Sequence, residues 1–158
     1  MLFRSGWVDV DAVDVAQPYP RGLMRPIPYG RAVQFTSFKR DDGLHGDSAG
    51  LARGVPTSFK VRDMGLGRVA LDRVALGEGS RWLSVDDTGK VDLRAGRPGA
   101  PQSFQWIETP TGELVLLSLV THRYLRIDPA TGTITADSPG PVPDGSDGVR
   151  LVWRTAGT

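Results

Sequence analysis

Cysteine is absent from this 158-residue chain, which excludes disulfide bonds and zinc sites built on thiolates. Histidine is scarce: His45 and His122 stand far apart in the sequence, so we expect neither a histidine-based catalytic group nor a metal site. No apolar run approaches the about 20 residues that a membrane-spanning helix needs. The formal net charge is +1 and the arginines are interleaved with aspartates, so we expect no nucleic-acid or membrane partner.

Helical periodicity is lacking as well. The 20 glycines and 12 prolines are scattered along the chain, and no stretch of about 12 residues keeps the period of a helix. Short apolar or alternating runs lie between turn residues instead, which predicts an all-β protein.

The first 29 residues differ from the rest of the chain. Residues 1–16 contain valines that alternate with aspartates, which predicts one strand with an acidic outer face. Residues 17–29 hold four prolines and predict an extended linker. A single strand needs partners, so we expect residues 1–16 to be the last strand of a truncated upstream β domain. The alternative is a native start whose strand packs on the domain that follows.

From Gly30 onward the expected strands come in three groups of four, and equivalent segments are about 42 to 47 residues apart. The segment Arg81–Leu83 aligns with Arg123–Leu125, and Phe104–Trp106 aligns with Leu151–Trp153. The expected strands are 32–38, 43–47, 49–54 and 58–64; 68–74, 81–87, 90–96 and 103–109; and 113–119, 123–128, 133–137 and 149–155. A period of this length, present three times, indicates a repeat architecture.

Three four-stranded repeats fit a β-trefoil better than a propeller. Propellers need about four blades or more, and the Trp-Asp blade signature is missing. Closure of three repeats into a short barrel with a cap hides the sheet edges. We therefore expect a monomeric β-trefoil over residues 30–158, with repeats of about 30–65, 66–111 and 112–156. Two sets of equivalent positions are expected in its core: Phe59, Phe104 and Leu151, and Val61, Trp106 and Trp153.

The second repeat resembles a fascin-like β-trefoil repeat. The resemblance rests on Val69-Ala70-Leu71, Trp82-Leu83, Gly89-Lys90-Val91 and Phe104-Gln105-Trp106. It covers about residues 30–156. Bacterial trefoils of this kind often follow the catalytic domain of a secreted glycoside hydrolase. The resemblance therefore implies an extracellular, non-catalytic carbohydrate-binding accessory module, with a glycan and a parent catalytic domain as partners. The Gln-x-Trp signature of ricin-type relatives is absent, because Gln105 and Trp106 are adjacent.

The sequence lacks the common catalytic and metal-binding motifs. No serine lies in a Gly-x-Ser-x-Gly elbow, and no nucleotide-binding glycine loop is present. The acidic residues stand mostly in turns, where Asp and Gly are favoured for conformational reasons. Two acidic groups, residues 9–14 and 143–148, do not follow a calcium-loop pattern. We expect no catalytic residue, no cofactor and no metal.

A glycan site needs an aromatic ring for stacking and polar groups that bind hydroxyls. Trp82 and Tyr124 are the candidate rings, because repeat one has Leu44-His45 in their place and they are therefore not part of a three-fold core layer. The carboxylates that follow them, Asp86, Asp87 and Asp128, are the candidate polar groups, with turn formation as the alternative explanation. The alternative to a glycan-binding module is a structural or protein-interaction trefoil without a glycan site.

Overall fold

The computed structural model describes residues 25–75 and 77–156. These residues form twelve strands and one short 3-10 helix, and they contain no helix that is long and apolar enough to cross a membrane. The elements of repeat one are β1 (Ala32–Ser37), β2 (Gly43–Asp47), β3 (Gly50–Gly54) and β4 (Phe59–Gly65). Repeat two holds β5 (Arg68–Arg73), β6 (Trp82–Val85), β7 (Val91–Arg94), η2 (Ala100–Gln102) and β8 (Phe104–Glu108). Repeat three holds β9 (Leu114–Ser118), β10 (Tyr124–Ile127), β11 (Ile134–Ser138) and β12 (Leu151–Thr155).

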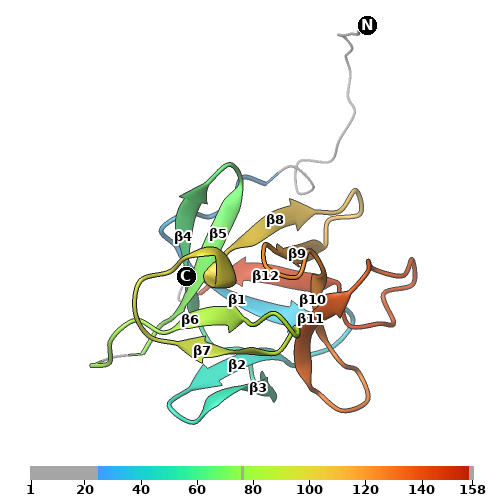
Figure 1. Cartoon of the computed structure of the whole chain (residues 1–158). Helices are drawn as coiled ribbons and strands as arrows, with labels where there is room; N and C mark the ends of the chain where they lie inside the picture. The colour runs from blue at the N-terminus through green and yellow to red at the C-terminus, as the bar shows by residue number, and fades with distance from the viewer. Residues whose placement is uncertain (1–24, 76, 157–158) are drawn as a thin grey trace, which may run out of the picture.

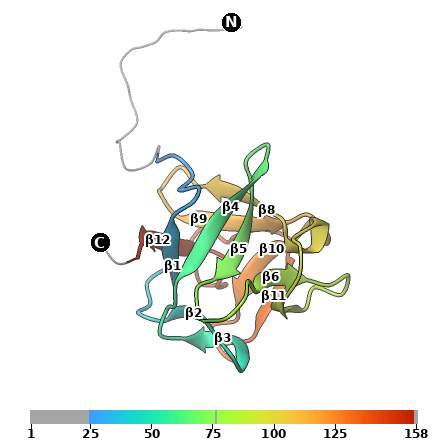
Figure 2. The same ribbon diagram turned by 90° about the vertical axis from the view of Figure 1, so that its left-hand side faces the viewer.

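The strands make a β-trefoil. Six of them close a barrel through the antiparallel pairs β1–β4, β4–β5, β5–β8, β8–β9, β9–β12 and β12–β1. The other six form three cap hairpins, β2–β3, β6–β7 and β10–β11. The β4–β5 hairpin lies at one end of the molecule and the β2–β3 hairpin at the other (Figures 1 and 2). The sequence prediction of fold and of all twelve strands is confirmed, with strand ends that agree within two residues.

The barrel core repeats three times. Val33 pairs with Phe59, Val69 with Phe104 and Leu114 with Leu151, and all six side chains are fully buried. Two residues along, Val61, Trp106 and Trp153 form the next layer. The indoles of Trp106 and Trp153 meet edge to face with ring centroids 5.5 Å apart, which is a favoured geometry for aromatic pairs. Both predicted core sets are confirmed.

The cap hairpins also have equivalent positions, and here the expected alignment needs a correction of one residue. Trp82 begins the β6–β7 pairing opposite Arg94, and Tyr124 begins the β10–β11 pairing opposite Ser138. The corresponding residue of β2 is Gly43, which pairs with Gly54, and not the Leu44-His45 pair. Leu44 instead takes the buried place of Leu83 and Leu125. The sequence alignment was wrong by one residue because Gly43 has no side chain that resembles the aromatic rings of Trp82 and Tyr124.

The predicted strand within residues 1–16 lies outside the described residues, as does most of the predicted linker. The described end of that linker contacts the trefoil. Ile27 packs against the core, and the backbone N–H of Gly30 donates to the carbonyl of Val61 over 2.7 Å. The described end of the linker therefore lies against the barrel, with Gly30 bonded to β4.

Candidate functional site

The Trp82 pocket is a hollow of about 510 Å³ between repeats one and two, lined by Tyr29, Gly30, Lys60, Val61, Arg62, Asp63, Asp72, Ser80 and Trp82. Three antiparallel strands build it. β4 and β5 pair over their whole length, and Trp82 at the start of β6 pairs with Asp72 of β5. Side chains alternate along a strand, so Val61 enters the core while Lys60 and Arg62 face outward on either side of it.

Trp82 forms a wall of this pocket rather than an exposed stacking platform. Its side chain is only 6% exposed, and the indole Nε1–H donates to the carbonyl of Gly96 over 2.8 Å. The guanidinium carbon of Arg62 lies 5.9 Å from the centroid of the ring, within the range of a cation–π contact. The predicted residue thus lines a pocket, but most of its surface is committed to packing.

Tyr29 supplies the exposed ring of the Trp82 pocket, and the sequence reasoning missed it. It is 39% exposed. Burial of the phenol and the negative charge of Asp63 both raise the pKa of Tyr29, so the hydroxyl stays a hydrogen-bond donor at neutral pH. The residue fell inside the predicted proline-rich linker, where no ordered structure was expected. Backbone hydrogen bonds from Gly30 to Val61 and from Val61 to Arg31 are what hold it beside β4.

Asp72 is the fixed carboxylate of the pocket. One of its oxygens accepts the backbone N–H of Arg81 over 3.0 Å, and the other accepts the hydroxyl of Ser80 over 2.8 Å. A carboxylate oxygen has lone pairs for more than one hydrogen bond. Asp72 can therefore accept further hydrogen bonds while its orientation is held, which is the property that a hydroxyl-binding group needs.

The combination of aromatic ring and carboxylate occurs in one repeat. In repeat two, Trp82 pairs with Asp72. At the equivalent place in repeat three Tyr124 pairs with Leu117, and in repeat one Gly43 pairs with Thr36. The core residues are similar in the three repeats, whereas the residue that pairs with the first residue of the cap hairpin differs: it is Thr36, Asp72 or Leu117. The carboxylate is therefore a feature of repeat two.

Asp86 and Asp87 line a different hollow of about 530 Å³, which we call the Asp86 pocket, together with Ser84, Val85, Asp92, Arg94, Ala95, Pro101, Gln102 and Val120. Asp86 closes the β6–β7 turn: its Oδ1 accepts hydrogen bonds from the hydroxyl and backbone N–H of Thr88 and from the backbone N–H of Lys90. These bonds, that of the Thr88 hydroxyl first, lower the pKa of Asp86. Asp92 is paired with Arg94 at 3.2 Å. No aromatic side chain lines this pocket.

Tyr124 and Asp128 lie in repeat three and line neither of these two pockets. Tyr124 is half-buried at the start of β10. Asp128 closes the β10–β11 turn by accepting the backbone N–H groups of Ala130 and Thr131, and it pairs with Arg126 at 3.6 Å. The five predicted site residues are thus divided among the Trp82 pocket, the Asp86 pocket and repeat three.

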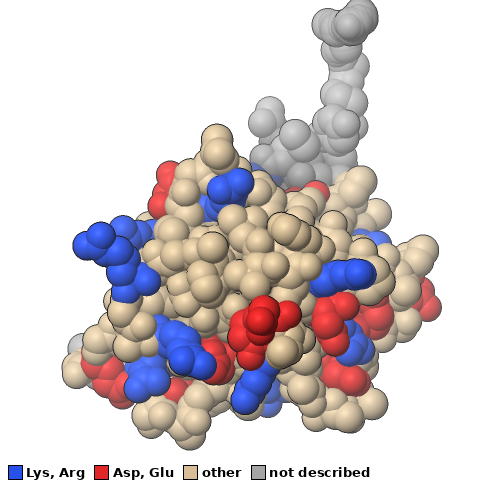
Figure 3. Space-filling view, viewed as in Figure 1, with Lys and Arg blue, Asp and Glu red and all other residues tan. Residues whose placement is uncertain are grey.

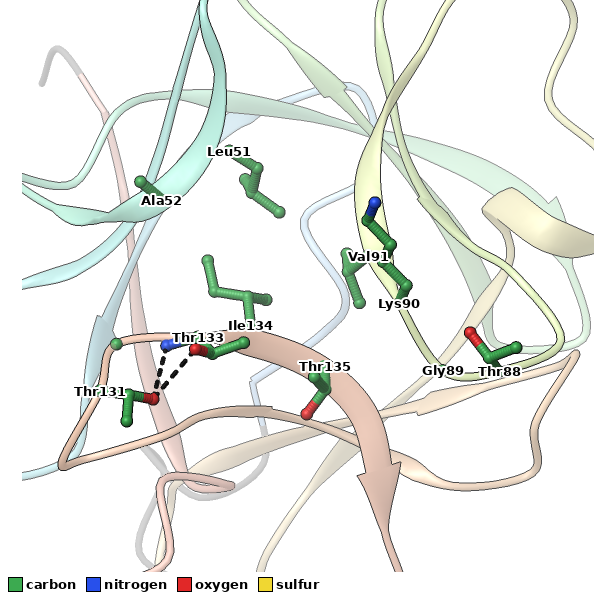
Figure 4. Close-up of a pocket in the computed structure, with 11 residues that line it drawn as sticks. Leu51, Ala52, Thr88, Gly89, Lys90, Val91, Thr131, Thr133, Ile134 and Thr135 are labelled. Atoms are coloured by element: carbon green, nitrogen blue, oxygen red, sulfur yellow. Dashed lines mark hydrogen bonds between the residues drawn. The ribbon is translucent and has the colours of Figure 1, made fainter.

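A third hollow, the axial pocket, lies where the three cap hairpins meet (Figure 4). It measures about 410 Å³. Its floor holds one apolar residue from each repeat, Leu51, Val91 and Ile134, and threonines surround it. The hydroxyl of Thr131 donates to that of Thr133 over 3.0 Å, and the hydroxyls of Thr88 and Thr135 donate to aspartates. Because these donors are used internally, the axial pocket offers a ligand fewer free polar groups than the Trp82 pocket.

Charge and metal ligands add no further site in the described part of the chain. Positive and negative side chains are intermingled on the face shown in Figure 3, which forms no stripe of one sign. Within residues 25–75 and 77–156, no group of three or more His, Cys, Asp or Glu side chains is arranged to hold a metal ion.

No protein-family model and no curated protein sequence matches the chain. Solved structures do match. ThreeFoil, a designed three-fold symmetric protein, aligns with a TM-score of 0.60 and 14% identity over 77% of this chain and 96% of its own. A Polyporus squamosus lectin, solved with Neu5Acα2-6Galβ1-4GlcNAc bound, aligns with a TM-score of 0.62 and 11% identity over 80% of this chain and 49% of its own. A GH43 β-1,3-galactosidase aligns with a TM-score of 0.66 and 9% identity over 81% of this chain and 28% of its own.

At these identities the likeness shows the fold alone, a β-trefoil. The chain spans about half of the lectin and little more than a quarter of the galactosidase. Folds of this kind carry many functions, so function has to be argued from the pockets.

Proposed function

We propose that this trefoil is a non-catalytic carbohydrate-binding module and that the Trp82 pocket is its glycan site. The observation that carries the proposal is the exposed ring of Tyr29 beside the fixed carboxylate of Asp72 in one open hollow. A pyranose ring has an apolar C–H face and a rim of hydroxyls. Tyr29 can stack on the first, and Asp72 can accept hydrogen bonds from the second.

Two basic side chains complete the pocket. Lys60 and Arg62 project from β4 on the same face of the strand, and both are hydrogen-bond donors that sugar oxygens can accept. Arg62 already lies near the ring of Trp82, which limits its freedom. Lys60 pairs with Asp72 across the β4–β5 ladder, so a donor and an acceptor lie next to each other and can bind adjacent hydroxyls of one sugar.

A binding role fits the chemistry of the pocket better than catalysis. A glycosidase needs two carboxyl groups with separate acid and base or nucleophile roles. In the Trp82 pocket, both oxygens of Asp72 already accept hydrogen bonds, and Asp63 accepts the backbone N–H of Gly65 over 2.8 Å. Both carboxylates are therefore held in place by hydrogen bonds from the protein, which suits the fixed acceptors of a binding site.

We further propose that the module belongs to a larger secreted glycoside hydrolase, in which it holds the catalytic domain near its polysaccharide. The resemblance to fascin-like trefoils supports this, as does the alignment with about a quarter of a GH43 enzyme chain. Sequencing the genomic DNA upstream of the codon for Met1 tests it. The expected result is an open reading frame that continues into a signal-bearing catalytic domain. A stop codon directly upstream would contradict it.

Binding is tested with the full chain on a panel of insoluble and soluble polysaccharides, including xylan, arabinan, β-glucan, galactan and chitin. We expect retention on at least one. Tyr29→Ala should lower the affinity about fivefold or more, because one stacked aromatic ring contributes on the order of 1 kcal/mol, which is about a factor of five in Kd.

Tyr124→Leu is the control, since it removes an aromatic ring that lies outside the Trp82 pocket, at the position of repeat three that corresponds to Trp82. It should leave the affinity unchanged. Retention on none of the polysaccharides would contradict the proposal and favour the alternative, a structural or protein-interaction trefoil.

A further inference from the structure

The end of the barrel away from the cap holds a group of residues that the proposed glycan site does not use. We call Arg25, Trp106, Glu108 and Trp153 the barrel mouth. Trp106 and Glu108 are two residues apart on β8 and therefore face the same side of the strand. Trp153 comes from β12 and contacts Trp106 edge to face. Arg25 arrives from the segment before β1.

The guanidinium of Arg25 is held in three ways. Its central carbon lies 3.9 Å from the centroid of the Trp153 ring. Nη2 donates to Oε2 of Glu108 over 3.2 Å, and Nη1 donates to the backbone carbonyl of Trp153 over 3.4 Å. Stacking on an indole combined with forked hydrogen bonding is a mode that suits a planar guanidinium and not a compact ammonium.

In the barrel mouth, the carboxylate of Glu108 is buried, whereas the side chain of Arg25 that pairs with it is partly exposed. The side chain of Glu108 is 9% exposed and that of Arg25 is 35% exposed. A buried carboxylate is costly unless a positive charge or hydrogen-bond donors compensate it. Arg25 is the ion-pair partner of Glu108 in the described residues, so removal of Arg25 leaves a negative charge with strong demand for a cation.

Among the described residues, four buried polar atoms of the barrel mouth have no hydrogen-bond partner. They are Nε of Arg25, Oε1 of Glu108 and the indole Nε1 atoms of Trp106 and Trp153, all of them buried. Buried polar atoms are nearly always paired in native proteins. The barrel mouth therefore has unused hydrogen-bonding capacity around a charge and an aromatic ring, as expected of a recognition site.

We propose that the barrel mouth is a binding site for a guanidinium group, occupied here by Arg25 of the same chain, and that it accepts an arginine side chain of a partner protein when Arg25 is withdrawn. The tether gives Arg25 a high effective concentration, on the order of millimolar or above. A partner must therefore displace Arg25. None of the four barrel-mouth residues lines the Trp82 pocket, and the proposal does not depend on glycan binding.

The test uses the full chain with Arg25→Ala and the probe Nα-acetylarginine methylamide, whose blocked termini leave the guanidinium as its one charged group. Two-dimensional NMR follows the indole N–H signals of Trp106 and Trp153. The indole of Trp82, bonded to Gly96, is the internal reference. We expect saturable shifts of the first two signals with a Kd of about 1 to 10 mM. The wild-type protein should bind at least about tenfold more weakly, because Arg25 competes.

Two controls make the result specific. Nα-acetyllysine methylamide should bind Arg25→Ala several-fold more weakly than the arginine probe, since an ammonium cannot stack and fork in the same way. Adding Glu108→Gln to Arg25→Ala should abolish saturable binding. If Arg25→Ala does not fold, Arg25→Gln replaces it with the same expectations. The proposal is overturned if the indole signals do not move at about 50 mM probe, if wild type and variant respond alike, or if Glu108→Gln has no effect.

Discussion

Gly43 shows at the scale of one residue how the backbone of the fold limits the side chains at the start of a cap hairpin. A Cβ atom placed on Gly43 would lie 1.9 Å from the carbonyl oxygen of Phe35, far inside van der Waals contact. The equivalent residues Trp82 and Tyr124 carry large rings, so the β1–β2 crossing is closer than its two counterparts. Repeat one therefore cannot form the aromatic pocket of repeat two.

Gly43→Ala should destabilise the protein by about 2 to 3 kcal/mol, because the added methyl group forces the backbones of β1 and β2 apart. Urea denaturation of the purified variant measures this. Gly79→Ala is the matched control, since a Cβ on Gly79 meets no atom within 4 Å, and its effect should stay within about 0.5 kcal/mol. Equal losses of stability in the two variants would contradict the conclusion that the backbones of β1 and β2 are too close for a side chain at position 43.

His45 makes stability depend on pH. Its Nδ1 hydrogen-bonds to the carbonyl of Val55 over 2.8 Å, and Nε2 lies 3.1 Å from a carboxylate oxygen of Asp47. These two bonds, that of Val55 first, raise the pKa of His45. The folded state therefore holds the proton more tightly than the unfolded state, so the stabilisation is fully present below about pH 6.5 and is lost as the pH rises through the folded pKa.

The free energy of unfolding should accordingly fall between about pH 6.5 and the folded pKa, and His45→Gln should remove this part of the slope. Denaturant titrations at several pH values measure it. Asp47→Asn keeps the hydrogen bond to Val55 and should weaken the slope without abolishing it. A slope that is unchanged in His45→Gln would show that another group is responsible.

The cap hairpins explain, at the scale of elements, why the acidic residues recur at regular intervals. Asp47 is the last residue of β2, and Asp86 and Asp128 directly follow β6 and β10. Each accepts backbone N–H groups of its own turn. Turn formation, weighed as the alternative role of Asp86 and Asp128, is thus present in the structure. Asp87 accepts no such bond that the structure records in the β6–β7 turn.

Asp86→Ala should lower the melting temperature because three hydrogen bonds of the β6–β7 turn are lost, whereas Asp87→Ala should leave it unchanged. Asp86→Asn should recover most of the loss, since an amide oxygen closes the same turn. Differential scanning fluorimetry compares the three variants. A glycan affinity that falls with Asp87→Ala, at unchanged stability, would instead move the binding site to the Asp86 pocket.

The elements were predictable from the sequence to a greater extent than the site. Alternating apolar residues and Gly or Asp turns have local causes, so all twelve strands could be predicted with nearly correct ends. Tyr29 could not, because its role depends on hydrogen bonds between Gly30, Arg31 and Val61, about 30 residues apart in the chain. Trp82 was predicted from its chemistry, but its burial and its bond to Gly96 follow from long-range packing.

The whole molecule combines a shared core with surfaces that differ between repeats. The period of the sequence reports the core, since Phe59, Phe104 and Leu151 fill equivalent places. It does not predict the Trp82 pocket, which lies where the repeats differ, with Asp72 in repeat two and Leu117 at the corresponding place in repeat three. For this reason the sequence repeat was sufficient to predict the fold but not the binding site.

The equivalence of core positions can be tested by exchange. Phe104→Leu introduces the residue that repeat three carries at this place and should cost roughly 1 to 2 kcal/mol, whereas Phe104→Ala leaves a larger cavity and should cost about 3 to 5 kcal/mol. Denaturant unfolding measures both. A Leu variant as unstable as the Ala variant would contradict the interchangeability of the three positions.

The most direct test of the central claim is an NMR titration of the isotope-labelled full chain with an oligosaccharide of the polysaccharide that retains it. We expect saturable chemical-shift changes in the residues that line the Trp82 pocket, namely 29–30, 60–63, 72, 80 and 82. The signals of the axial pocket and of the Asp86 pocket should not change. Shifts that cluster in either of those pockets, or no shifts with any oligosaccharide, would contradict it.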